Sequence, residues 1–207
     1  DAFDYDLCKS YIDDVDHSKI NIFTYDAYEF QKQIMTILKV AQIMATKYHV
    51  VATNPPYLNR MNAQLKEYVD KHYKDYKTDL FSVFMYRNFE LCSPGGYSGF
   101  MTPFVWMFIK SYEKLRGYII KNKSITSLIQ MEYSAFEEAT VPICSFVLKN
   151  SQEDSVGLYF RLSEFTGGME VQKKKVLEAI ANPNCGYYYE TSENNFEKIP
   201  GNRIGYW

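Results

Sequence analysis

The feature that most constrains the fold is an alternation between stretches with a helical hydrophobic period and short β-branched runs. Residues 28–47 place apolar side chains three and four positions apart, which predicts a helix with one buried face. The run 48–53 follows, and it stops at Asn54, Pro55 and Pro56, because prolines cannot continue a sheet ladder. We therefore expect a buried strand that ends at Asn54.

The alternation continues to residue 149. Asp79 can cap a helix from Leu80 to Leu91, which the residues 93–96 (SPGG) then end. The patterns further predict strands over 97–101, 124–131 and 141–149, and a helix over 104–123. Strands alternating with helices predict an α/β sheet. The last two strands should pair antiparallel at one edge, because their connection, 132–140, is too short for a crossover of about a dozen residues.

The pattern is weaker beyond residue 150. It predicts a strand over 158–162, a helix over 170–181 and a strand over 187–189. At the other end, the first thirty residues carry eight acidic side chains against two basic ones. This N-terminal segment is therefore not expected to lie along a phosphate backbone.

Composition excludes several classes of function. The net charge of -2 means that contact with nucleic acid must come from a local patch. No apolar run approaches the roughly 20 residues that span a bilayer, and the acidic N-terminus is unlike a signal peptide. The four cysteines are far apart and form no cluster with histidines, so we expect no metal site and no disulfides. These features predict a cytoplasmic protein that makes no membrane contact.

The tetrapeptide from Asn54 to Tyr57 is the best candidate for chemistry. Its two prolines fix a rigid turn, which leaves carbonyl oxygens free to accept hydrogen bonds from a ligand, and Asn54 adds a side-chain acceptor. Two such acceptors suit an exocyclic amine, because they offset the positive charge that develops when its nitrogen attacks a methyl group. Tyr57 could then stack on the ring of a flipped base. The alternative is a rigid loop in which Tyr57 only covers the edge of the core.

This motif resembles the fourth motif of adenine-specific, S-adenosylmethionine-dependent DNA methyltransferases. The segments that extend the resemblance are LKVAQIMATKYHVVATNPPYLNRMNAQLKEYV, KTDLFSVFMYRNFELCSPGGYSGFMTPFVWMF, EKLRGYII and AFEEATVPICSFVL. Together they are similar to the catalytic half of the large methyltransferases of BREX phage-exclusion systems and of related type IIG restriction enzymes. The similarity covers about residues 35–207.

The resemblance implies the C-terminal part of a Rossmann-like class I methyltransferase sheet with an antiparallel edge strand. Residues 31–150 would be catalytic, and 151–207 would lead to a target-recognition domain. The enzyme would methylate adenine N6 in double-stranded DNA, with partner proteins of a defence system. Asn54 and the Pro55 carbonyl would accept from the amine, with Pro56 completing the motif, and Tyr57 and Phe136 would hold the base. Leu80 and Phe81 fall in a motif that begins near the cofactor.

The sequence also departs from the family pattern. The family has a glycine-rich turn for S-adenosylmethionine before this motif, whereas none of the ten glycines here precedes Gly95. We therefore expect a piece of a longer protein that is inactive alone. The motif also leaves open an RNA base or a protein glutamine as acceptor, or a nucleic-acid-binding module without catalysis. Basic side chains over 60–77 and 104–123 indicate either solvated surfaces or contacts to DNA.

Overall fold

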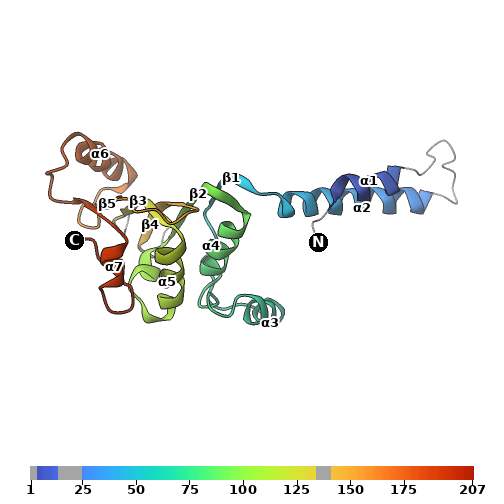
Figure 1. Ribbon diagram of the computed structural model, residues 1–207, viewed down its shortest axis with the longest axis horizontal. Helices are drawn as coiled ribbons and strands as arrows, with labels where there is room; N and C mark the ends of the chain where they lie inside the picture. Colours follow the sequence, from blue (N-terminus) through green and yellow to red (C-terminus); the bar gives the residue numbers. More distant parts are fainter. Residues whose placement is uncertain (1–3, 14–24, 134–140) are drawn as a thin grey trace. The chain divides into compact units, whose positions relative to one another are not determined.

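The computed structural model describes residues 4–13, 25–133 and 141–207, and the chain divides into two compact units, Asp1–Lys47 and Tyr48–Trp207 (Figure 1). In the first unit, α1 (Tyr5–Asp13) lies beside α2 (Tyr25–Ala45), and the Gln31 side chain donates to the Ile12 carbonyl over 2.6 Å. The predicted helix over 28–47 is confirmed.

The expectation of one buried face on that helix is wrong for several of its apolar side chains. Phe30 and Ile37 are 63% and 65% exposed, and Met44 is exposed as well. Ile34, Leu38 and Ala41 are only half-buried. Within the described part of this unit, α2 has only the nine-residue α1 to pack against, which is too short to cover it.

The second unit is built on a mixed six-stranded sheet with the order β1-β2-β4-β3-β5-β6. Its strands are β1 (Tyr48–Thr53), β2 (Cys92–Pro103), β3 (Ser124–Gln130), β4 (Ile143–Lys149), β5 (Gly157–Arg161) and β6 (Tyr188–Thr191). β1 is parallel to β2 and β3 is parallel to β5, whereas β4 runs antiparallel to both β2 and β3. β6 closes the sheet antiparallel to β5.

Two expectations about the sheet need correction. The strands predicted over 124–131 and 141–149 do pair antiparallel, with Leu128 opposite Phe146, but neither lies at an edge, because β5 and β6 extend the sheet. The antiparallel edge strand is β6. Conversely, β1 ends before Asn54 as predicted, but among the described strands it is an edge strand and it is not buried, since Val50 is 67% exposed.

Strand β2 begins five residues earlier than the sequence predicted. The Ser93–Gly96 stretch ends the preceding helix, and it is then accommodated as a bulge between the pairs Tyr48–Cys92 and Val50–Tyr97. Gly95 adopts a φ of 72°, and a Cβ on Gly96 would lie 2.6 Å from the His49 carbonyl oxygen. Gly96 is therefore needed for β2 to pass so close to β1, and Gly95 is needed for the left-handed backbone conformation of the bulge.

Helices α4, α5 and α7 lie on one side of the sheet (Figure 1). The helices of this unit are α3 (Ala63–His72), α4 (Leu80–Leu91), α5 (Glu113–Asn122), α6 (Gly168–Ala181) and α7 (Asn194–Glu197), with the 3₁₀ turns η2 (Phe104–Met107) and η3 (Lys110–Tyr112). The main core joins α4 and α5 to the sheet through buried side chains that include Phe81, Met85, Trp106, Leu115, Ile119, Phe146 and Tyr159. Phe196, Ile204 and Tyr206 complete this core from the C-terminal residues.

The predicted helix over 104–123 is broken in its first half. Residues 104–107 and 110–112 form the two 3₁₀ turns, and the α-helix begins only at Glu113. The fully buried Arg116 explains the break, because its guanidinium donates to the Trp106 and Ile109 carbonyls at 2.7 Å each and to the Gly201 carbonyl. A continuous helix would use the Trp106 and Ile109 carbonyls for its own backbone hydrogen bonds, whereas here the Arg116 side chain binds them.

Candidate active site at the end of strand β1

The tetrapeptide leaves the sheet where β1 ends. Because β1 and β2 are parallel, their carboxyl ends meet at the same edge, which is where open α/β sheets bind ligands. The side chains of Asn54 and Pro56 are exposed and Pro55 is buried, while Tyr57 is 39% exposed. The position after a strand end is therefore as the sequence predicted.

The structure brings the Asn54 and Tyr57 side chains into direct contact. The Tyr57 hydroxyl lies 3.0 Å from Asn54 Oδ1 and 3.2 Å from the Met101 carbonyl oxygen at the end of β2. Burial raises the pKa of Tyr57, with a smaller contribution from the Cys144 thiol, so this hydroxyl remains a hydrogen-bond donor at neutral pH. The Tyr57 ring meets Phe81 edge-on at 6.3 Å between centroids.

A shallow hollow of about 430 Å³ lies beside Asn54. It is lined by Ala52–Asn54 of the β1 end, by residues 99–101 of β2 and by residues 145–147 of β4. Its volume falls within the range of about 300–1,000 Å³ that is common for small-molecule sites. A planar ring can thus approach the Asn54 amide from the surface of the sheet.

The loop that follows Tyr57 is fixed to the start of α4 by Asp79. Its carboxylate accepts from the Leu58 amide at 2.9 Å and from the Phe81 amide at 3.2 Å, and the Leu80 amide donates to the Leu58 carbonyl at 3.0 Å. The predicted cap is thereby confirmed, and Ser82 completes a capping box. The sequence did not reveal that the cap also holds the loop, because nothing local points from Asp79 to Leu58.

The remaining predicted site residues are Leu80, Phe81 and Phe136. Leu80 and Phe81 are both buried, but in different clusters: Leu80 packs with Val69 and Val83, whereas Phe81 belongs to the main core and stacks on Tyr112. Their proximity to a cofactor stays a prediction. Phe136 lies outside the described residues.

The described residues do not by themselves fit S-adenosylmethionine. The ends of β1 and β2 run into Asn54-Pro55-Pro56 and Pro103-Phe104, neither of which is a glycine-rich turn whose amides could hold the cofactor. Within the same residues, no group of three or more His, Cys, Asp or Glu side chains could hold a metal ion. No helix there is long and apolar enough to cross a membrane.

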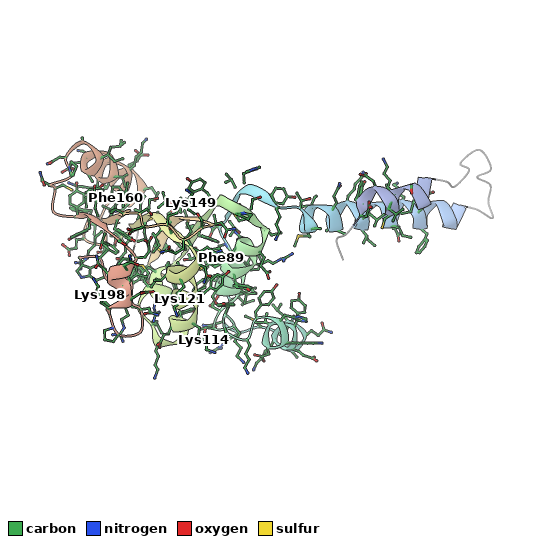
Figure 2. The ribbon with its side chains drawn as sticks, in the orientation of Figure 1. Phe89, Lys114, Lys121, Lys149, Phe160 and Lys198 are labelled. Carbon is green, nitrogen blue, oxygen red and sulfur yellow. The ribbon has the colours of Figure 1, made fainter. Side chains whose placement is uncertain are left out.

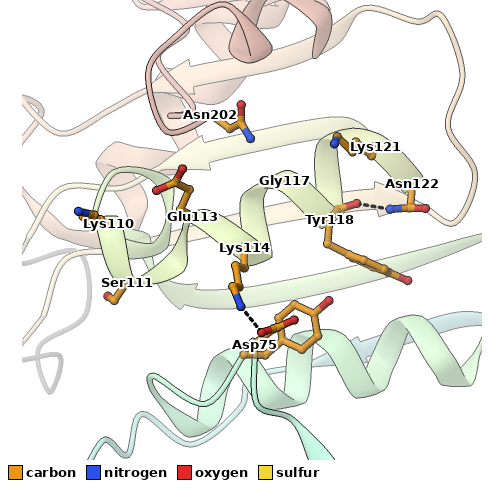
Figure 3. A pocket seen from close by; sticks show the side chains of 11 residues that line it. Asp75, Lys110, Ser111, Glu113, Lys114, Gly117, Tyr118, Lys121, Asn122 and Asn202 are labelled. Atoms are coloured by element: carbon orange, nitrogen blue, oxygen red, sulfur yellow. Dashed lines mark hydrogen bonds and ion pairs between the residues drawn. The ribbon is translucent and has the colours of Figure 1, made fainter.

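The basic stretch over 104–123 forms part of a second, larger hollow. Lys114 and Lys121 project from α5 (Figure 2), and with Lys110 they line a hollow of about 830 Å³ that also contains Asp75 and Glu113 (Figure 3). Lys114 is bound to Asp75 in an ion pair. The two carboxylates offset much of the positive charge, and none of the motif residues lines this hollow.

Comparisons with known proteins agree with this geometry. A family model described as the Eco57I restriction-modification methylase matches residues 4–136. The adenine-specific methyltransferase PglX of Lacticaseibacillus casei (strain Zhang) is 33% identical over 214 residues, which is 99% of this chain and 17% of that protein. The chain spans between 12% and 17% of the length of the curated relatives it matches.

Solved structures of restriction-modification enzymes show the same fold. The type I methyltransferase subunit from Streptococcus thermophilus matches with a TM-score of 0.59 and 16% identity, over 76% of this chain and 37% of that one. The type ISP restriction-modification enzyme LlaGI, solved as a nuclease-deletion mutant with a DNA substrate mimic, matches with a TM-score of 0.55 and 12% identity, over 83% of this chain and 19% of that one. The chain therefore shares its fold with these restriction-modification enzymes.

Proposed function

Because the chain belongs to the Eco57I restriction-modification methylase family, we propose that it forms part of an enzyme that methylates adenine N6 in double-stranded DNA. The observation that carries the proposal is the Asn54–Tyr57 motif, which lies at the end of β1 with its two functional side chains in contact. The methyl donor of the family is S-adenosylmethionine, and we place its main binding motif outside these residues. DNA as the partner is supported by the match to LlaGI, which was solved with a DNA substrate mimic.

In this proposal, the residues of the motif act on the amine of a flipped adenine. Asn54 Oδ1 and the Pro55 carbonyl each accept one amine hydrogen, which directs the nitrogen lone pair out of the ring and offsets the charge that develops on it. The amine replaces the Tyr57 hydroxyl as the donor to Asn54, and the Tyr57 ring then stacks on the base. Pro56 keeps the turn rigid, and Phe136 faces the base from the other side.

The domain limits, the location and the partners that we propose also follow from membership of this family. Residues 31–150 are the catalytic part, and residues 151–207 lead toward target recognition. We place the enzyme in the cytoplasm, in a phage-defence or restriction-modification system with partner proteins. A methyltransferase for RNA or for a protein glutamine would use the same acceptors, but a restriction-modification family favours DNA.

The first test is transfer of labelled methyl from S-adenosylmethionine to mixed-sequence DNA by the full-length protein, followed by digestion to nucleosides. We expect label in N6-methyladenine, and we expect Asn54→Ala to reduce its incorporation by at least about 100-fold, as removing a transition-state hydrogen-bond acceptor does. The matched control is Asn184→Ala, an exposed asparagine far along the chain from the motif, which should leave incorporation unchanged. Undiminished transfer by Asn54→Ala would reject the mechanism, and absence of label from every nucleoside of the DNA would reject DNA as the acceptor.

A further inference from the structure

A polar hollow follows the motif directly, and neither the fold nor the proposed chemistry accounts for it. It has a volume of about 670 Å³ and lies between three short segments of the second unit. Its lining residues are Asn59, Arg60 and Met61 from the loop after Tyr57, Lys66, Val69 and Asp70 from α3, and Lys77 and Thr78 from the residues before α4.

The walls of this hollow are held in place. The Asp79 carboxylate and the Leu80 amide fix Leu58 on one side, and Asn62 caps α3 by accepting from the Leu65 amide at 2.9 Å. Beneath the hollow, Val69 is buried with Leu80 and Val83. A rigid hollow of this kind can bind a ligand without first ordering a loop.

The charge of the hollow is positive. Three cationic side chains face a single carboxylate, and Lys77 is paired with that carboxylate, Asp70, at 2.6 Å. Lys77 and, more weakly, Lys66 lower the pKa of Asp70. Both Arg60 and Lys66 are exposed, and in the part of the chain that the structure describes neither cationic group has a hydrogen-bond or ion-pair partner. Two cations are therefore available to an anion.

The distance along the chain indicates which anion. Arg60 is three residues from Tyr57, and three residues span at most about 11 Å when fully extended. A group bound at Arg60 therefore lies within a few nucleotides of a base that stacks on Tyr57, once the lengths of the two side chains are included. Arginine binds phosphate oxygens through a planar pair of N–H donors, and lysine binds them as a point charge.

We propose that this hollow is a phosphodiester site, in which Arg60 and Lys66 bind the backbone of the target strand next to the flipped adenine. The inference rests on the proposed function. Contacts of this kind position the strand without reading its sequence. The site would keep the backbone fixed while the base rotates into the Asn54–Tyr57 pocket.

The test compares DNA binding of the full-length protein with that of the double variant Arg60→Gln/Lys66→Gln over a range of salt concentrations. We expect the variant to bind duplexes of any sequence roughly tenfold more weakly or worse, and the slope of log K against log salt to fall by about one for each charge removed. Arg60→Lys, which keeps the charge, should retain most of the slope. The matched control is Lys173→Gln/Lys174→Gln, which removes two exposed charges from α6.

An unchanged slope in the double variant, or an equal fall in the α6 control, would overturn the proposal. Circular dichroism of each variant establishes that the fold is kept. The two proposals can be rejected independently. If the wild-type protein methylates no nucleoside, the proposed function is rejected. A lower slope of log K against log salt in the double variant would still support the phosphate site.

Discussion

At the residue scale, the proposed chemistry depends on a side-chain pair, Asn54 and Tyr57, whose contact is only partly predictable from the sequence. The strand end and the two prolines predicted correctly where Asn54 and Tyr57 lie. The sequence could not show that the Tyr57 hydroxyl bridges Asn54 and Met101, because Met101 is 44 residues away and meets the loop only through the pairing of β1 with β2. The Tyr57 hydroxyl has one hydrogen and two possible acceptors. When a substrate amine donates to Asn54 in its place, the hydroxyl can still donate to the Met101 carbonyl.

This arrangement predicts that the ring of Tyr57 matters more than its hydroxyl. Tyr57→Phe should keep kcat/KM for methyl transfer within about fivefold, whereas Tyr57→Ala should lower it by about 10- to 100-fold, because base stacking is worth about 1–3 kcal/mol. Steady-state kinetics of the full-length variants on one duplex make the comparison. Equal activities for the Ala and Phe variants would mean that Tyr57 does not contact the base.

At the element scale, local signals predicted the six strands and the helices α2, α4 and α6, but neither α1, α3 and α7 nor how the elements are joined. The Asp79 cap, the strand ends and the helix α6 follow from short-range patterns. The break before α5 does not, because the helical hydrophobic period continues through residues 104–112 and does not show that the Arg116 guanidinium binds the Trp106 and Ile109 carbonyls. The Asp79 bond to the Leu58 amide is a long-range link, and it connects α4 to the motif.

We expect Asp79→Ala to destabilise the 207-residue chain by about 1–3 kcal/mol, since it removes a helix cap and leaves the Leu58 amide without its acceptor. Burial raises the pKa of Asp79, although the backbone amides that it accepts from act in the opposite direction, and Asp79→Asn keeps the acceptor oxygen, so this variant should keep most of the stability. Urea unfolding measures the free energy of unfolding of both variants, and Asp154→Ala, at an exposed position, is the control. A loss as large in the Asn variant would show that the charge, and not the acceptor geometry, stabilises the loop.

For the whole molecule, the period of the hydrophobic pattern was enough to predict an α/β fold, but strand order was not predictable from it. The same β-branched run suits an interior or an edge strand, and β1 is an edge strand among the described residues. The C-terminal residues likewise gave no local sign that they pack against this sheet, yet Tyr206 stacks on Tyr159 of β5 in the main core. The proposed limits of the catalytic part, 31–150, remain a prediction.

These 207 residues alone should not bind S-adenosylmethionine measurably. They supply acceptors for an amine at Asn54 and cations at Arg60 and Lys66, but no glycine-rich turn precedes the motif. Equilibrium dialysis with labelled S-adenosylmethionine should therefore detect no saturable binding to this chain at concentrations up to about 1 mM. This limit corresponds to a binding free energy of about -4 kcal/mol. The full-length protein should bind the cofactor in the same experiment. Stoichiometric binding at micromolar concentration would instead mean that residues near Asn54 and Phe81 complete a cofactor site by themselves.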